Sequence, residues 1–181
     1  SGTVLADPEL RDRLATELAR LGIGSGPDRR PDNTVEVQLP FLAHCFPDAR
    51  LLWLRAPSGE ASIGLGEAVF AAASGLGRSV AMLGSSDLTH YGPDYGFEPR
   101  GRGAGAEGWV REVNDRGFLD ALTALDCRAA LAHANSHLSA CSAGGAVAAL
   151  SFALAHAAGT GGKGSARLLA YAPSLDIRPS E

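Results

Sequence analysis

The densest group of proton-carrying side chains lies in residues 85–91, directly after the apolar run 80–83. Asp87 and His90 are three residues apart, close enough to converge if the loop turns into a helix. A carboxylate beside an imidazole fixes the tautomer of the ring and favours its protonated form, which suits a general base or a metal ligand. The commoner arrangement at this spacing is simpler. In it Asp87 caps a helix beginning at Leu88, and His90 is exposed in the first turn.

Cys141 is the second candidate, because it lies where a helix of small residues is expected to begin. The helix dipole stabilises a thiolate at this end, which suits a metal ligand or a nucleophile. The alternative is a small buried hydrophobe among alanines, which is the commoner role of a single cysteine. Cys45 and Cys127 are expected to have only that structural role.

Three weaker candidates complete the set. His133 and His137 are spaced i, i+4 and could chelate a metal from a helix, but their stretch carries no acid. Glu36 lies in the apolar segment 35–39, so it either faces solvent by alternation or is buried with a partner. No phosphate-loop or dinucleotide fingerprint is present.

Composition limits the kind of protein that carries these residues. The chain has 181 residues, a formal charge of −4 and 45% hydrophobic residues, which predicts a single globular domain over 1–181. Charges of both signs are interspersed, which gives no argument for nucleic acid or anionic membrane as a partner. Three widely spaced cysteines argue against a disulfide framework, and the apolar run 143–158 is short for a bilayer. A cytoplasmic location is therefore expected.

Five helices are expected from capping signals and from apolar residues at helical spacing. The first begins at Asp7 and Pro8 and ends at Gly22. The others are predicted over residues 60–74, 109–125, 128–134 and 142–158, with a Gly/Pro/Arg loop over 93–108.

Strands are predicted over 50–56, 79–84 and 166–172, where short apolar runs end at glycine or proline. Residues 35–39 alternate as a strand would, although Pro40 could equally open a helix. Strands alternating with helices indicate an α/β fold with a mostly parallel central sheet flanked by helices. Sites in such sheets form where loops leave the carboxyl ends of strands, which is where residues 85–92 lie.

Taken together, these segments resemble the MEMO family (also described as AmmeMemoRadiSam system protein B-like), a relative of the class III extradiol, or LigB-like, ring-cleaving dioxygenases. Four stretches carry the resemblance: "VEVQLPFL" at 35–42, "SSDLTHYG" at 85–92, "SACSAGGAVAAL" at 139–150 and "LLAYAPSLD" at 168–176. The resemblance implies a MEMO/LigB-like α/β fold and spans nearly the whole chain.

The resemblance also implies roles for individual residues. His90 would be the acid/base, Asp87 its orienting partner and Cys141 a metal ligand, while Ser85, Ser86 and Tyr91 would contact substrate. The implied metal is Fe(II), with copper or zinc as alternatives, since a cysteine with histidines suits all three.

This sequence departs from the family pattern in ways that affect the site. The family's N-terminal segments that supply two histidine ligands are not among these 181 residues, nor is its final strand. Asn33 stands where a histidine is usual, and Ser142 where glycine is usual. Because an incomplete parallel sheet leaves an exposed edge, we expect a second polypeptide, another copy of the chain or an N-terminal part to complete the sheet and the metal site.

Three function hypotheses follow from the resemblance and the residues. The first is a metal-dependent, extradiol-dioxygenase-like oxidoreductase acting on a small aromatic or otherwise oxidisable substrate. The second is a non-catalytic MEMO-like binding or scaffold protein. The weakest is a hydrolase with Cys141 as nucleophile and His90 as base.

Overall fold

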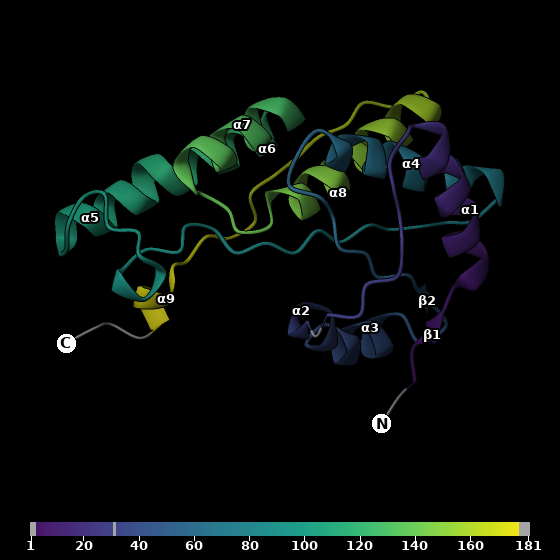
Figure 1. The fold of residues 1–181 in the computed structure, drawn as a ribbon, viewed down its shortest axis with the longest axis horizontal. Coiled ribbons are helices and arrows are strands. Elements are labelled where there is room, and N and C mark those ends of the chain that lie inside the picture. The colour runs from purple at the N-terminus through teal and green to yellow at the C-terminus, as the bar shows by residue number, and fades with distance from the viewer. Residues whose placement is uncertain (1–2, 31, 178–181) are drawn as a thin grey trace.

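The computed structural model describes residues 3–30 and 32–177, most of which lie in or between helices (Figure 1). The longer helices are α1 Pro8–Arg20, α4 Ala61–Gly75, α7 Cys127–His137 and α8 Ala143–Gly159. The shorter ones are α2 Asn33–Glu36, α3 Leu39–Cys45, α5 Ala104–Trp109, α6 Arg116–Thr123 and α9 Ser174–Ile177. A π-helix, Val110–Asp115, joins α5 to α6, and a 3₁₀ turn spans Pro93–Tyr95.

The helix α1 forms as its capping signals predict. The Asp7 carboxylate accepts a hydrogen bond of 3.0 Å from the N–H of Leu10, and Pro8 lies in the first turn. Leu14 and Leu18 then bury one face against α4. The predicted helix at the start of the chain is therefore confirmed, with its end at Arg20.

Two hydrophobic clusters share α8. The first joins α1, α4 and α8 around Leu14, Val69 and Phe152. The second joins α6, α7 and α8 around Phe118, Leu131 and Val147. The helices predicted over 60–74, 128–134 and 142–158 are confirmed with small shifts of their ends.

The prediction for residues 93–108 was wrong in part, because the 3₁₀ turn and α5 occupy segments expected to be loop. The helix expected to begin at Trp109 is instead continuous with α5 and passes through the π-helix into α6. Gly117 fits this helix because a Cβ there would lie 2.1 Å from His133 Nε2 of α7. Glycine at this position allows α6 and α7 to pack closely.

The strand interpretation of residues 35–39 was wrong. Asp32 accepts a hydrogen bond of 2.9 Å from the Thr34 N–H and so starts α2, and Pro40 lies in the first turn of α3. Alternation of apolar and polar residues over so few positions also fits short helical turns. The alternative that Pro40 opens a helix is confirmed.

The predicted central sheet is reduced, among the described residues, to two short strands. Strand β1 Leu5–Ala6 pairs in parallel with β2 Arg50–Leu51, with Leu5 opposite Arg50 and Ala6 opposite Leu51. The predicted strand 50–56 therefore forms only in its first two residues. Helices with a small parallel sheet are compatible with the α/β class, while a large sheet flanked by helices is not formed within the described ranges.

The segments 79–84 and 166–172, both predicted as strands, form no backbone hydrogen bond with any described residue. Both run from the end of the molecule at α4 and α8 toward the end that carries α5 and α9 (Figure 1). Leu83 is 73% exposed and Leu169 is 79% exposed, so their apolar side chains have no cover either. A β-strand needs a neighbour to bond its backbone groups, which is why these segments are not strands here.

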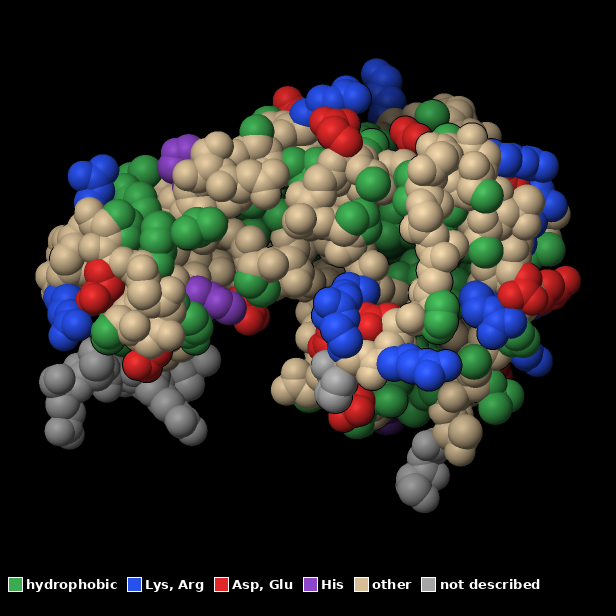
Figure 2. Space-filling model, viewed as in Figure 1, with side chains coloured by type: hydrophobic (Ala, Val, Ile, Leu, Met, Phe, Trp, Pro, Cys, Tyr) green, Lys and Arg blue, Asp and Glu red, His purple; other side chains and the backbone are tan. Residues whose placement is uncertain are grey.

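The space-filling view shows an arched molecule, hollowed beneath its middle between the end with α2 and α3 and the end with α5 and α9 (Figure 2). Several large apolar side chains are exposed on α3, on the residues that follow α2 and α3, and on the residues after β2, namely Val37, Phe41, Phe46, Trp53 and Leu54. No helix in the described part of the chain is long and apolar enough to cross a membrane.

Candidate metal centre

Asp87, His90 and Cys141 come together although the third is far away in sequence. One ligand atom from each lies within 4.8 Å of those of the other two. The His90 Nε2 atom lies 3.2 Å from Asp87 Oδ2, which is a hydrogen bond between the ring and the carboxylate. The alternative that Asp87 caps a helix beginning at Leu88 is wrong, because residues 85–91 are not helical.

Backbone contacts join the two segments that carry this cluster. The Cys141 N–H donates to the Asp87 carbonyl at 3.0 Å, and the Asp87 N–H donates back to Cys141 Sγ at 3.3 Å. The Ser86 hydroxyl donates to the Asp87 carbonyl at 2.9 Å and accepts from the Ser142 N–H at 3.0 Å. Cys141, including its sulfur, is therefore held beside the backbone of Asp87.

Glycines let the start of α8 approach these segments. A Cβ at Gly84 would lie 2.3 Å from the Gly145 carbonyl oxygen, and a Cβ at Gly144 would lie 1.8 Å from the Pro57 carbonyl oxygen. A side chain at Gly84 would push the start of α8 away from residues 84–85, and one at Gly144 would push it away from Pro57. The Gly144-Gly145 pair thus serves close packing, as its small size suggests.

We expect Gly84→Ala to lower the free energy of unfolding by about 1–3 kcal/mol, because the added methyl would overlap the backbone of Gly145. Chemical denaturation monitored by circular dichroism measures this change. The control is Gly24→Ala, where a Cβ meets nothing within 4 Å, and its effect should stay within about 0.5 kcal/mol. Equal effects at both positions would contradict the close-packing argument.

The cluster is accessible to solutes. The side chain of Asp87 is 79% exposed and that of His90 is 38% exposed. Tyr95 stacks on the His90 ring with centroids 4.6 Å apart and planes 28° apart, which restricts rotation of the imidazole. His90 is therefore oriented by a carboxylate at its edge and an aromatic ring on its face.

The predicted substrate contacts have mixed surroundings. The Ser86 hydroxyl already bonds two backbone groups of the cluster. The Tyr91 hydroxyl donates to the Gly101 carbonyl at 2.8 Å and accepts from the Arg100 N–H at 3.0 Å, so it closes the loop that follows. The backbone of Ser85 lies beside the start of α8, where a Cβ at Gly145 would lie 3.2 Å from the Ser85 carbonyl oxygen.

The weaker candidates lie outside the cluster. His133 and His137 stack on each other with centroids 4.4 Å apart, and His133 Nδ1 lies 2.8 Å from Ser139 Oγ. Burial and the neighbouring His137 lower the pKa of His133, which keeps this ring neutral. Glu36 is exposed on α2, so it faces solvent as one alternative expected, although from a helix and not from an alternating strand.

The other two cysteines also lie apart from the cluster. Cys45 is exposed on α3, so its expected role as a buried hydrophobe was wrong. Cys127 is buried at the start of α7, as predicted. Burial, reinforced by the adjacent Asp126, raises the pKa of the Cys127 thiol, which makes it a poor thiolate.

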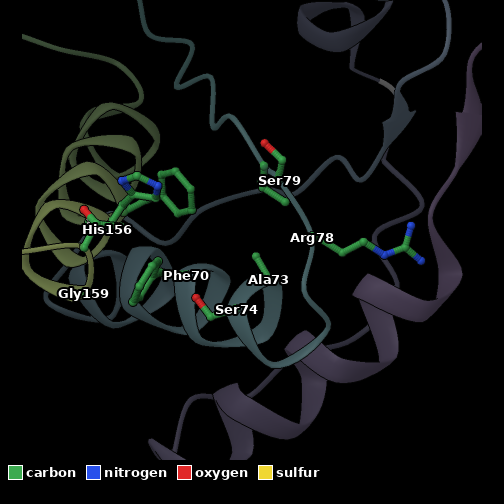
Figure 3. Close-up of a pocket in the computed structure, with 10 residues that line it drawn as sticks. Phe70, Ala73, Ser74, Arg78, Ser79, His156 and Gly159 are labelled. Atoms are coloured by element: carbon green, nitrogen blue, oxygen red, sulfur yellow. Dashed lines mark hydrogen bonds between the residues drawn. The ribbon is translucent and has the colours of Figure 1, made fainter.

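Two cavities in the described structure are separate from the cluster. One, of about 210 Å³, lies between the ends of α4 and α8 beside Phe70 and His156, and Arg78 extends from its rim toward α1 (Figure 3). There the Arg78 guanidinium pairs with Glu9 and lies 4.0 Å from Asp7. The other, of about 470 Å³, lies beside Glu67 and Cys127. Neither is lined by a cluster residue, and the exposure of Asp87 makes the candidate centre an open surface site.

The sequence analysis missed the residues that hold the 85–91 loop in place through hydrogen bonds to Thr89. Asn114 and Asp115 are 1% and 3% exposed, and both bond Thr89, while the Tyr171 hydroxyl donates to Asp115 at 2.7 Å. Two adjacent polar residues inside an otherwise amphipathic helix were the available signal. Burial of both is what makes them notable, and that needed the fold.

Comparison with known proteins matches this chain to a single family. The family model described as "Memo-like protein" matches residues 1–181. A MEMO1 family protein from Pyrococcus abyssi is 34% identical over 124 residues, which cover 63% of this chain and 43% of that protein. Similar proteins come from Thermococcus onnurineus (33% over 106 residues; 54% and 36%) and Methanothermobacter thermautotrophicus (28% over 129 residues; 69% and 40%). The chain spans less than half the length of these relatives, and no solved structure matches it.

Proposed function

Because this chain belongs to the family of Memo-like proteins, we propose that it carries part of a metal-dependent oxidoreductase centre of the extradiol-dioxygenase type. The fold of the complete protein would then be the MEMO/LigB-like α/β fold. The observation that supports the proposal best is the convergence of a carboxylate, an imidazole and a thiol within 4.8 Å.

The donor set fits a transition metal. The Cys141 thiolate would be the ligand from this chain, and its sulfur lies within 4.8 Å of donor atoms of Asp87 and His90, so a metal bound there would lie beside both groups. A thiolate completed by histidine ligands suits iron, copper or zinc, and we propose Fe(II).

His90 would move the proton in this centre. Its Nε2 atom is engaged by Asp87, and no described residue bonds Nδ1, so Nδ1 is the atom left to take a proton from the substrate. Asp87 would fix the tautomer and stabilise the imidazolium, while Cys141 and further ligands hold the metal. A bound metal would supply the binding and activation of dioxygen and of the substrate's oxygen atoms.

The substrate would be a small aromatic or otherwise oxidisable molecule. Tyr95 supports this class, because its ring is 60% exposed beside the cluster and could stack on a planar substrate. Ser85 and Tyr91 are the proposed polar contacts. Ser86 would contribute through the Asp87 carbonyl that it bonds.

We also propose that strands from a second polypeptide, or from another copy of the chain, complete the sheet and the ligand set. The unpaired segments 79–84 and 166–172, with Leu83 and Leu169 uncovered, support such pairing. So does the length of the relatives, which are more than twice as long as the matched region. With Cys141 as the ligand from this chain, the additional histidine ligands would come from that source.

The rival proposal is a non-catalytic binding or scaffold protein. The exposed apolar side chains along 79–84, 166–172 and α3 support it, because apolar surface of this extent marks interaction sites. Under this proposal the same cluster is only the wall of a binding site. Metal content separates the two proposals.

The deciding experiment is metal analysis of the chain purified anaerobically with whatever polypeptide accompanies it, followed by oxygen uptake with a panel of catechols. We expect close to one iron, or one copper, per chain and oxygen consumption that depends on that metal. A folded assembly that binds no iron, copper or zinc at micromolar concentrations would refute the oxidoreductase proposal and favour the binding protein.

A further inference from the structure

We propose that Asn114 and Asp115 are positioning residues that hold the two halves of the Asp87, His90 and Cys141 cluster in register. The inference deepens the proposed function and rests on it only for the consequence in metal affinity. Its basis is a hydrogen-bond network beneath the cluster that neither the sequence motifs nor the family resemblance points to.

The π-helix Val110–Asp115 creates the platform for this network. A π-turn is wider than an α-turn, is rare, and is frequently found at functional sites. Here it ends with two consecutive polar residues that are both almost fully buried, Asn114 at 1% and Asp115 at 3% exposure.

Asp115 holds the half of the cluster that carries Asp87 and His90. Its Oδ1 atom accepts the Thr89 N–H at 3.0 Å and the Thr89 hydroxyl at 2.5 Å. Its Oδ2 atom accepts the Tyr171 hydroxyl at 2.7 Å. Burial and this carboxylate raise the pKa of Tyr171, so the phenol keeps its proton and remains a donor.

Asn114 joins that half to the segment leading to Cys141. Its amide Nδ2 donates to Thr89 Oγ1 at 2.9 Å and to the His137 carbonyl at 3.1 Å. That carbonyl lies at the end of α7, just before Leu138, whose φ of 51° turns the chain toward Cys141. The two amide hydrogens therefore fix the distance between the 85–91 loop and the end of α7.

These bonds matter because residues 85–91 belong to no helix or strand in the described structure. The bonds between Asp87 and Cys141 join the two halves of the cluster directly. Asn114 joins them a second time by bonding both Thr89 and the His137 carbonyl, while Asp115 holds Thr89. Bonds to a buried carboxylate are roughly twice as strong as neutral ones. Removing a group that positions a metal ligand typically lowers metal affinity about 10–100-fold. The network holds the loop whose Asp87 backbone bonds Cys141, so we expect its loss to lower metal affinity by a factor in that range.

The test measures two properties of the chain, purified with any polypeptide that accompanies it. Amide hydrogen exchange reports the loop without any metal, and anaerobic titration with Co²⁺ reports the cluster. We expect Asp115→Ala to speed exchange of the Thr89 and Asp87 amides at least about tenfold and to weaken Co²⁺ binding about 10–100-fold. Thr89→Val should weaken Co²⁺ binding less, and Thr89→Ser should restore it to within about twofold because serine keeps the hydroxyl.

Asp120→Ala is the matched control, since this carboxylate lies on α6 and pairs only with Arg116 at the surface. It should change neither property. Unchanged exchange at Thr89 and Asp87 in folded Asp115→Ala would overturn the inference. If the wild type binds Co²⁺, an equal Co²⁺ affinity in Asp115→Ala would overturn it as well. If the wild type binds no Co²⁺, the metal proposal fails and the exchange data alone decide the positioning role.

Discussion

Replacing Cys141 by alanine is expected to lower the affinity of the assembly for its metal by at least about 100-fold, or about 2.7 kcal/mol. Cys141 supplies the only sulfur in the cluster, and a thiolate contributes both a strong bond and a charge that offsets that of the ion. Competition with a chromophoric chelator measures the change. The metal should also be lost when the variant is dialysed under conditions that leave the wild type loaded.

Two variants separate ligation from structure at this position. Cys141→Ser keeps an acceptor for the Asp87 N–H, which bonds Sγ at 3.3 Å, but replaces a soft donor by a hard one. It should therefore fold like the wild type and still lose most of the affinity. Cys45→Ala is the control, because that thiol is free and exposed on α3. Undiminished affinity in Cys141→Ser would mean that sulfur is not a ligand.

The helices could be predicted because local interactions determine them. Asp7 and Pro8 set the start of α1, and the apolar spacing of Leu10, Leu14 and Leu18 gives its buried face. The same holds for α4 and α8, whose small residues allow close contact, as at Gly66, where a Cβ would lie 2.3 Å from the Ala148 carbonyl oxygen. Sequence patterns within one helix are sufficient information for such elements.

The sequence could not show whether the predicted strands form, because a strand pairs with residues that are distant in sequence or belong to another chain. The apolar residues of 79–84 and 166–172 indicate burial in a sheet, yet Leu83 and Leu169 are exposed and their backbones lack partners among the described residues. The apolar pattern of these segments is typical of strands that are buried in a sheet. Pairing strands supplied by another polypeptide would explain both the pattern and the exposure.

The site was predictable in its chemical groups and not in its support. The motifs at 85–92 and 139–150 indicated Asp87, His90 and Cys141, and these residues do lie together. The adjacent polar pair was the local sign at Asn114 and Asp115, but burial of both against Thr89 in a π-helix depends on how α5 and α6 pack. Side chains that act by positioning other side chains do not produce a recognisable motif in the spacing of residues along the sequence.

His90→Gln is expected to reduce turnover about 10²–10⁴-fold while leaving the metal content unchanged. Glutamine can keep a hydrogen bond to Asp87, now 3.2 Å from His90 Nε2, but its amide cannot take up a proton near neutral pH. The loss should therefore appear in kcat rather than in folding or metal loading. Steady-state oxygen uptake, with metal content measured on the same samples, tests this.

The control for this prediction is His44→Gln, because His44 is exposed on α3 and lies outside the cluster. It should leave turnover and metal content as they are in the wild type. If His90→Gln loses its metal together with its activity, His90 is a ligand, and the acid/base role must pass to a group from the completing polypeptide. If His90→Gln turns over normally, the imidazole carries no proton in the reaction, and the Asp87–His90 pair only shapes the edge of the site.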